Sequence, residues 1–144
     1  MSYNDYKKQA IKDLSDYNYL KSSLITLSQR IELLQNSFSQ SSYHSQTKVM
    51  TSVSTDEKVI AHISQIEQLE HTLKCNTLKV QSIENALCAL PEKDRNLMMS
   101  FYVNRQRNSV ATLARNSYTD RSCIYRRAQK SLEKYIFAFF GIEK

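Results

Sequence analysis

Apolar residues recur every three or four positions over two long stretches of the chain. In the first stretch they are Tyr17, Leu20, Leu24, Leu27, Ile31, Leu34 and Phe38, with a less regular continuation back through Ala10 and Tyr6 that Asp13 interrupts. In the second they are Val59, Ile66, Leu69, Leu73, Val80, Ile83, Leu87 and Leu90, with the polar residues His62 and Asn76 in the same series. This spacing places each series on one face of an α-helix. It predicts two long helices, the first from about residue 4 to about residue 37.

Residues 39–55 separate these two stretches and are dominated by Ser, Thr and Gln without helical periodicity. They are typical of a flexible connection. The sequence Ser54-Thr55-Asp56-Glu57 at its end matches a capping box, in which the serine oxygen accepts a bond from the third helical N–H. The second helix is therefore predicted to begin there. Two helices of about 35 residues joined by a short linker fold back most simply as an antiparallel hairpin.

The apolar face of this hairpin has two possible uses. It packs one helix on the other within a chain, or it joins several chains, because the same heptad pattern serves both purposes. Asn76 accordingly faces either its own copy in a second chain or a polar group of the first helix. We expect a homo-oligomer in which the contact is made by Leu24, Leu27, Ile31, Leu34, Ile66, Leu69, Leu73 and Asn76.

The last third of the chain divides into shorter elements. Leu90-Pro91-Glu92 marks a helix start, with proline at the first helical position, and the apolar face that follows holds Leu97, Met98, Phe101 and Tyr102. After a polar break at 104–108, Ser109 is expected to cap a short helix over 110–115. Asp120 is expected to cap a longer basic helix that starts at Arg121. A short helix, a tight turn and a longer helix make the layout of a helix-turn-helix.

An apolar tail ends the chain. It contains Leu132, Tyr135, Ile136, Phe139 and Phe140 and closes at Gly141, the only glycine, which suits a helix C-cap. This much aromatic area is expected to pack on the helix that begins near Pro91 or on a second subunit. The whole chain is thus predicted to be all-α, with a helical hairpin over 1–89 and a helix-turn-helix domain over 90–144.

Positive charge is confined to the predicted helix-turn-helix domain. The chain has a formal net charge of +6, and seven of its eight arginines lie between Arg95 and Arg127. Residues 1–89 hold nine basic and nine acidic residues, so they are neutral, whereas residues 90–144 hold eleven and five. Such a concentration is expected of a surface that binds phosphates, although a solvated basic face has the same composition.

This segment resembles region four of bacterial sigma factors, the domain that reads promoter DNA. The similarity is carried by Leu90-Pro91-Glu92-Lys93-Asp94-Arg95, by Ser109 and Leu113-Ala114, and by Arg121-Ser122-Cys123-Ile124-Tyr125-Arg126-Arg127 with Leu132-Glu133-Lys134. The chain as a whole is similar to the small phage-encoded, sigma-like transcription regulators of the RinA and ArpU type. That resemblance implies control of phage late genes in a Gram-positive host, with double-stranded DNA and host RNA polymerase as partners. The protein is expected in the cytoplasm, because its first residues lack the charged and apolar regions of a signal peptide and no window is apolar enough to cross a bilayer.

One residue departs from the family pattern. The family has glycine in the turn between the two helices, where the backbone is left-handed, and Tyr118 stands there in this sequence. Either Asn116 supplies the turn or the turn is one residue longer. With Asp120 as the cap, Ala114 and Ile124 point inward and hold the two helices together.

The same register assigns roles to the polar residues. Arg121, Ser122, Tyr125 and Arg126 share the outward face that would enter the major groove, and Arg121 and Arg126 are the expected base readers because a guanidinium can bond guanine O6 and N7 together. The expected phosphate contacts are Arg105, Arg107, Arg115, Arg127 and Lys130.

Other classes of protein are disfavoured. Cys75, Cys88 and Cys123 have no CxxC spacing, and His44, His62 and His71 form no ligand pair, so neither a metal nor another cofactor is expected. We expect no enzyme, since no glycine loop or nucleophile arrangement is present, and no membrane association. The alternative to DNA binding is a protein-binding adaptor or inhibitor that reuses the helix-turn-helix scaffold.

Overall fold

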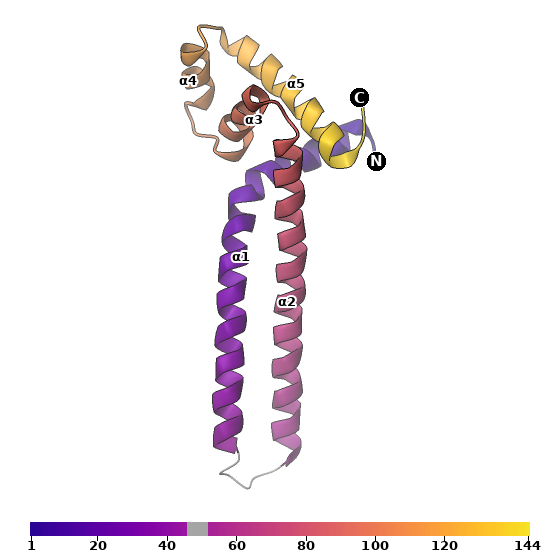
Figure 1. The fold of residues 1–144 in the computed structure, drawn as a ribbon, viewed down its shortest axis with the longest axis vertical. Coiled ribbons are helices and arrows are strands. Elements are labelled where there is room, and N and C mark those ends of the chain that lie inside the picture. The colour runs from indigo at the N-terminus through magenta and orange to yellow at the C-terminus, as the bar shows by residue number, and fades with distance from the viewer. Residues whose placement is uncertain (46–51) are drawn as a thin grey trace. The chain divides into compact units, whose positions relative to one another are not determined.

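The computed structural model describes residues 1–45 and 52–144, with side chains over 1–37 and 56–144, and in that part of the chain helices are joined by short loops (Figure 1). The described residues contain no strand, so the all-α prediction is confirmed. The elements in order are α1 (Tyr3–Ser45), α2 (Ser52–Cys88), α3 (Glu92–Met98), the π-helical segment η1 (Met99–Val103), α4 (Ser109–Asn116) and α5 (Arg121–Phe140).

The two long helices are longer than their apolar pattern predicts. α1 continues to Ser45 and α2 begins at Ser52, so most of the predicted connection at 39–55 is helical. The part of that prediction on residues 46–51 lies outside the described residues. Ser54 falls inside the first turn of α2, so the prediction that it caps the helix is wrong. Serine, threonine and glutamine lower helix stability only by a few tenths of a kcal/mol each, and no glycine or proline interrupts the segment.

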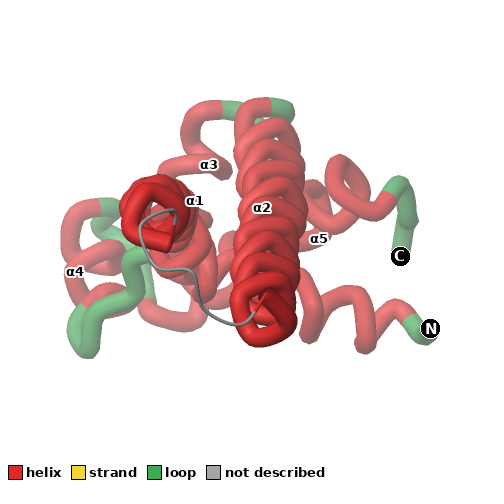
Figure 2. The backbone as a smooth tube through the Cα atoms, turned by 90° about the horizontal axis from the view of Figure 1, so that it is seen from below, coloured by secondary structure: helices red, strands yellow, loops and turns green. Residues whose placement is uncertain are grey.

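Residues 20–78, the hairpin unit, hold the antiparallel pair formed by parts of α1 and α2, and these helices lie side by side in both views (Figures 1 and 2). Leu27 and Ile31 are buried at the predicted apolar face, and the remaining predicted contact residues Leu24, Leu34, Ile66, Leu69, Leu73 and Asn76 are half-buried. The hairpin prediction is confirmed, and its apolar face packs within one chain.

Two polar contacts cross the hairpin. The side-chain amide of Asn76 donates to Ser23 Oγ at 3.0 Å, so Asn76 meets a polar group of the first helix. His62 Nε2 lies 2.6 Å from the carbonyl oxygen of Leu34. Polar pairs at such positions fix the register of two helices, because a shift would leave them without partners.

Residues 1–19 and 79–144 form a second compact unit, here called the terminal unit. This division differs from the predicted one between residues 89 and 90, because the first part of α1 and the end of α2 belong with the C-terminal helices. The hydroxyl of Tyr17 donates to Glu84 at 2.6 Å, and burial together with this bond raises the pKa of Tyr17 to about 12. Asp13, which interrupts the apolar pattern, is 3% exposed and lies 3.6 Å from the Lys79 ammonium.

The C-terminal tail is part of the core of the terminal unit. Leu132, Tyr135 and Ile136 have no exposed surface. The Phe140 ring lies 5.0 Å from that of Tyr6 on α1, a partner that the sequence did not suggest. Gly141 has φ +71° and its N–H donates to the Phe137 carbonyl at 2.9 Å, which confirms it as the C-cap.

Asp94 links α3 to α5 through both carboxylate oxygens. Ser131 Oγ donates to Oδ1 at 2.6 Å, and the Lys134 ammonium donates to Oδ2 at 2.8 Å. Ser131 is fully buried, so its hydroxyl depends on this partner. The bonds from Lys134 and Ser131 hold the pKa of Asp94 below its ordinary value of 3.8.

We expect Asp94→Asn to lower the free energy of unfolding by about 1–2 kcal/mol at pH 7, because a charged acceptor is lost from two bonds. Since the folded pKa of Asp94 is lowered, the stabilisation is fully present above pH 3.8 and disappears as the pH falls through the folded value. Urea denaturation of both proteins between pH 7 and pH 3 would show the difference shrinking. Glu92→Gln, at an exposed carboxylate on the same helix, is the control and should change the free energy by less than about 0.5 kcal/mol. A difference that does not change with pH would contradict the assignment.

Candidate nucleic-acid interface

Four residues, 117–120, connect α4 to α5, and they form a complete Schellman turn at the end of α4. The Thr119 N–H donates to the Ala114 carbonyl at 3.0 Å, and the Tyr118 N–H donates to the Arg115 carbonyl at 3.3 Å. Tyr118 occupies the left-handed position with φ +53°. Both interpretations offered by the sequence are therefore wrong: neither Asn116 nor a longer turn replaces the glycine, because the tyrosine itself adopts the glycine conformation.

Tyr118 holds this conformation at a cost, since a bulky side chain at positive φ crowds its own backbone. We expect Tyr118→Gly to raise the free energy of unfolding by about 1 kcal/mol and the melting temperature by about 4 °C. Tyr118→Ala is the matched control, because it removes the ring but keeps the Cβ. The ring is 96% exposed, so its loss alone should change little. Equal gains in both variants, measured by thermal denaturation, would show that the turn is not strained.

The caps on either side of the turn fix the register of the basic helix. Asp120 is the N-cap of α5, as predicted, and its carbonyl accepts from Cys123 N at 3.1 Å, although its side chain makes no capping bond. α4 is capped by Asn108 and not by Ser109, which is its first residue. The Ser109 hydroxyl instead accepts from the Gln106 N–H at 2.7 Å and closes the preceding turn. At α3 the proline is likewise one position earlier than predicted, as N-cap.

A small core holds α4 and α5 together. Ala114 is 8% exposed and Ile124 is 1% exposed, and both pack with Phe101 and Ala128. The prediction that Ala114 and Ile124 point inward is confirmed. Alanine at both helix surfaces allows the backbones to approach, which keeps the start of α5 close to α4.

Three arginines from two segments line one concavity beside this core. Arg105 and Arg107 come from the loop before α4, and Arg121 is the first residue of α5; we call these three the arginine cluster. The concavity measures about 180 Å³ and is completed by Gln106, Asn108, Val110, Ala111 and Tyr125. No acidic residue lines it. No ion pair or side-chain hydrogen bond joins these three arginines to another described residue, so their charges are available to an anion from outside the chain.

One member of the arginine cluster, Arg105, packs on an aromatic ring. The guanidinium of Arg105 lies 4.8 Å from the centroid of the Phe101 ring, and the Tyr125 ring meets the same ring edge-on at 5.5 Å. Phe101 is buried and belongs to the π-helical segment, where the Asn104 N–H donates to the Met99 carbonyl at 2.7 Å. From the sequence Phe101 could be placed only on the apolar face of a helix, because a π-helical turn has no clear sequence signal.

The remaining predicted site residues lie on other surfaces of α4 and α5. Ser122, Arg126 and Lys130 follow one another at intervals of four residues and are exposed, so they form a row along α5. Arg115 is exposed near the end of α4. Arg127 lines a different cavity, together with Lys93 and Ser117. Arg121, Ser122, Tyr125 and Arg126 are all exposed at neighbouring positions of α5, and Arg121 and Tyr125 also line the concavity of the arginine cluster.

Comparisons with protein-family models, with curated proteins and with solved structures gave no significant match. Within the described residues, no group of three or more His, Cys, Asp or Glu side chains is placed to hold a metal ion. None of the described helices is both long and apolar enough to cross a membrane.

Proposed function

We propose that the protein is a sequence-specific regulator of transcription that binds double-stranded DNA through α4, the 117–120 turn and α5 as a helix-turn-helix. In this proposal the exposed row on α5, formed by Ser122, Arg126 and Lys130, enters the major groove. Arg126 reads base edges there, while Ser122 and Lys130 contact the edges of the groove. The arginine cluster holds the neighbouring phosphates. The one observation that carries the proposal is the convergence of Arg105, Arg107 and Arg121 on a concavity without an acidic residue.

Two features support this assignment over a solvated basic face. A solvated face would leave the arginines spread over the surface, whereas residues 16 positions apart, Arg105 and Arg121, here line the same concavity. In addition, the Phe101 ring beneath Arg105 fixes the position of the Arg105 guanidinium and so lowers the conformational entropy lost when a phosphate binds.

The biological setting is proposed from the residue pattern. Because residues 90–134 resemble region four of sigma factors, we propose that the protein controls late genes of a phage or mobile element, with contact to host RNA polymerase. A homo-oligomer would place two or more copies of the helix-turn-helix on DNA, and its half-sites would then repeat at a fixed spacing.

The test is selection of binding sites from a library of random duplexes by the full-length protein, followed by affinity measurements on the selected and on unrelated duplexes. We expect a recurring sequence, and a dissociation constant for it that rises steeply with salt, since each neutralised phosphate contributes about −0.9 to the slope of log K against log salt. Equal affinity for all duplexes would refute sequence-specific control. Stable binding of a protein partner that persists after the arginines are replaced would favour the adaptor function instead.

A further inference from the structure

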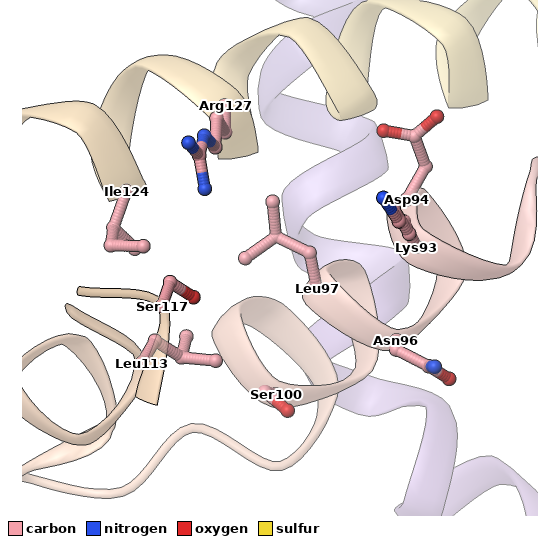
Figure 3. Close-up of a pocket in the computed structure, with 9 residues that line it drawn as sticks. All are labelled: Lys93, Asp94, Asn96, Leu97, Ser100, Leu113, Ser117, Ile124 and Arg127. Atoms are coloured by element: carbon pink, nitrogen blue, oxygen red, sulfur yellow. The ribbon is translucent and has the colours of Figure 1, made fainter. Parts of the chain in front are cut away.

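A second cavity lies on the other flank of α5, between α3, the end of α4 and α5 (Figure 3). It measures about 600 Å³, which is within the range of about 300–1,000 Å³ found for small-molecule sites. All of its lining residues belong to the terminal unit. It shares no lining residue with the arginine cluster.

The inner surface of this cavity is apolar. Leu97 of α3, Leu113 of α4 and Ile124 of α5 contribute to it, and the Leu97 side chain points across the cavity toward α5 (Figure 3). Ile124 is 1% exposed, so it forms the base of the cavity and not its rim. Leu97 and Leu113, which are half-buried, offer an aliphatic surface to a ligand that enters from solvent.

One cation points into the same space. The guanidinium of Arg127 extends from α5 toward the gap between Leu97 and Ile124 (Figure 3). No side chain or backbone group of the described residues forms an ion pair or hydrogen bond with it. A guanidinium beside an apolar surface binds a carboxylate through two parallel N–H···O bonds more strongly than in open water.

Asp94, the one acidic residue on the lining, is paired with other residues and not with Arg127. Both carboxylate oxygens of Asp94 are occupied, by Ser131 at 2.6 Å and by Lys134 at 2.8 Å. Lys93 adds a second positive charge to the rim. The cavity thus combines an aliphatic inner surface with an uncompensated positive charge.

We propose that this cavity binds a small amphipathic organic acid, with its carboxylate on Arg127 and its aliphatic part against Leu97 and Leu113. A bound ligand would touch α4 before the 117–120 turn and α5 after it. It would therefore stabilise the two helices against each other. The proposal is independent of DNA binding, because it concerns a different flank of α5 and is tested without DNA.

The probe is octanoate, titrated into the full-length protein and followed by ligand-observed NMR, with octanamide as the uncharged counterpart. We expect saturable octanoate binding with a dissociation constant of about 1 mM or lower, and binding of octanamide at least about tenfold weaker. Arg127→Gln should weaken octanoate binding by about tenfold or more. Arg126→Gln removes the same charge from the neighbouring residue on the exposed row, and it should change the affinity less than about twofold.

Three results would overturn the proposal: no saturable binding up to about 10 mM octanoate, equal binding of octanamide, or equal losses in the two arginine variants. The first would show that the cavity does not take this class of ligand. The other two would show that the anion is not held by Arg127. Leu97→Ala should also weaken octanoate binding. Its circular dichroism spectrum, if unchanged from that of the original protein, would show that the loss comes from the cavity and not from unfolding.

Discussion

Replacing Arg105, Arg107 and Arg121 together by glutamine is expected to weaken DNA binding by a factor of about 100 to 1,000 at low salt. Each arginine of the cluster is proposed to hold a phosphate, and a charged hydrogen bond of this kind contributes about tenfold or more. The slope of log K against log salt should also become shallower by about 3, because about one counterion is released for each phosphate contact. Fluorescence anisotropy on a labelled duplex at several salt concentrations measures both quantities.

A matched variant separates the cluster from net charge. Lys12, Arg30 and Lys74 are exposed and lie outside the cluster, and their replacement by glutamine also lowers the net charge from +6 to +3. This control should weaken DNA binding only slightly, by the loss of long-range attraction. If the two triple variants lose the same affinity, the cluster is not a phosphate site and the proposed binding surface is wrong.

Leu14→Ala is expected to lower the free energy of unfolding of the terminal unit by about 3 kcal/mol. Leu14 lies in α1, far from the C-terminal helices in sequence, yet it has no exposed surface. Truncation of a fully buried leucine costs about 2–5 kcal/mol, through lost burial and the cavity left behind. Leu33→Ala on the same helix is the control, because Leu33 is 68% exposed and should cost less than about 0.5 kcal/mol.

Hydrogen exchange should show where the loss occurs. If residues 1–19 belong to the terminal unit, Leu14→Ala should speed exchange in α3 and α5 as well as in the first part of α1. Faster exchange confined to α1 would support the division of the chain at residues 89 and 90 that the sequence suggested. The same measurement on Leu33→Ala gives the baseline.

The features that the sequence predicted well depend on local spacing. The apolar face through Leu27 and Ile31 could be predicted, because a helix that packs against one partner helix has apolar residues at regular spacings of three and four. The register of α5 could be predicted, because the spacing between Ala114, Asp120 and Ile124 matches a helix-turn-helix with a turn of this length. The structure confirms these positions.

The features that were missed depend on contacts between distant residues. The packing of the first part of α1 with α5 rests on pairs such as Tyr6 and Phe140, which no local pattern connects. Asp13 looked like a defect in an apolar face, because its partner Lys79 lies 66 positions away. The meeting of Arg105 and Arg107 with Arg121 at one concavity was also hidden, since the loop carrying Arg105 and Arg107 has no periodicity from which to place it.

The division of the chain has a consequence for how its length can change. The hairpin unit, residues 20–78, is an insertion between two segments of the terminal unit. Because the hairpin is a heptad pair, removal of seven residues from each helix would preserve the apolar face and bring the remaining positions back into register. The distance spanned by this insertion can therefore be varied in steps of one heptad, about 10 Å each, while the sequence that forms the terminal unit stays the same.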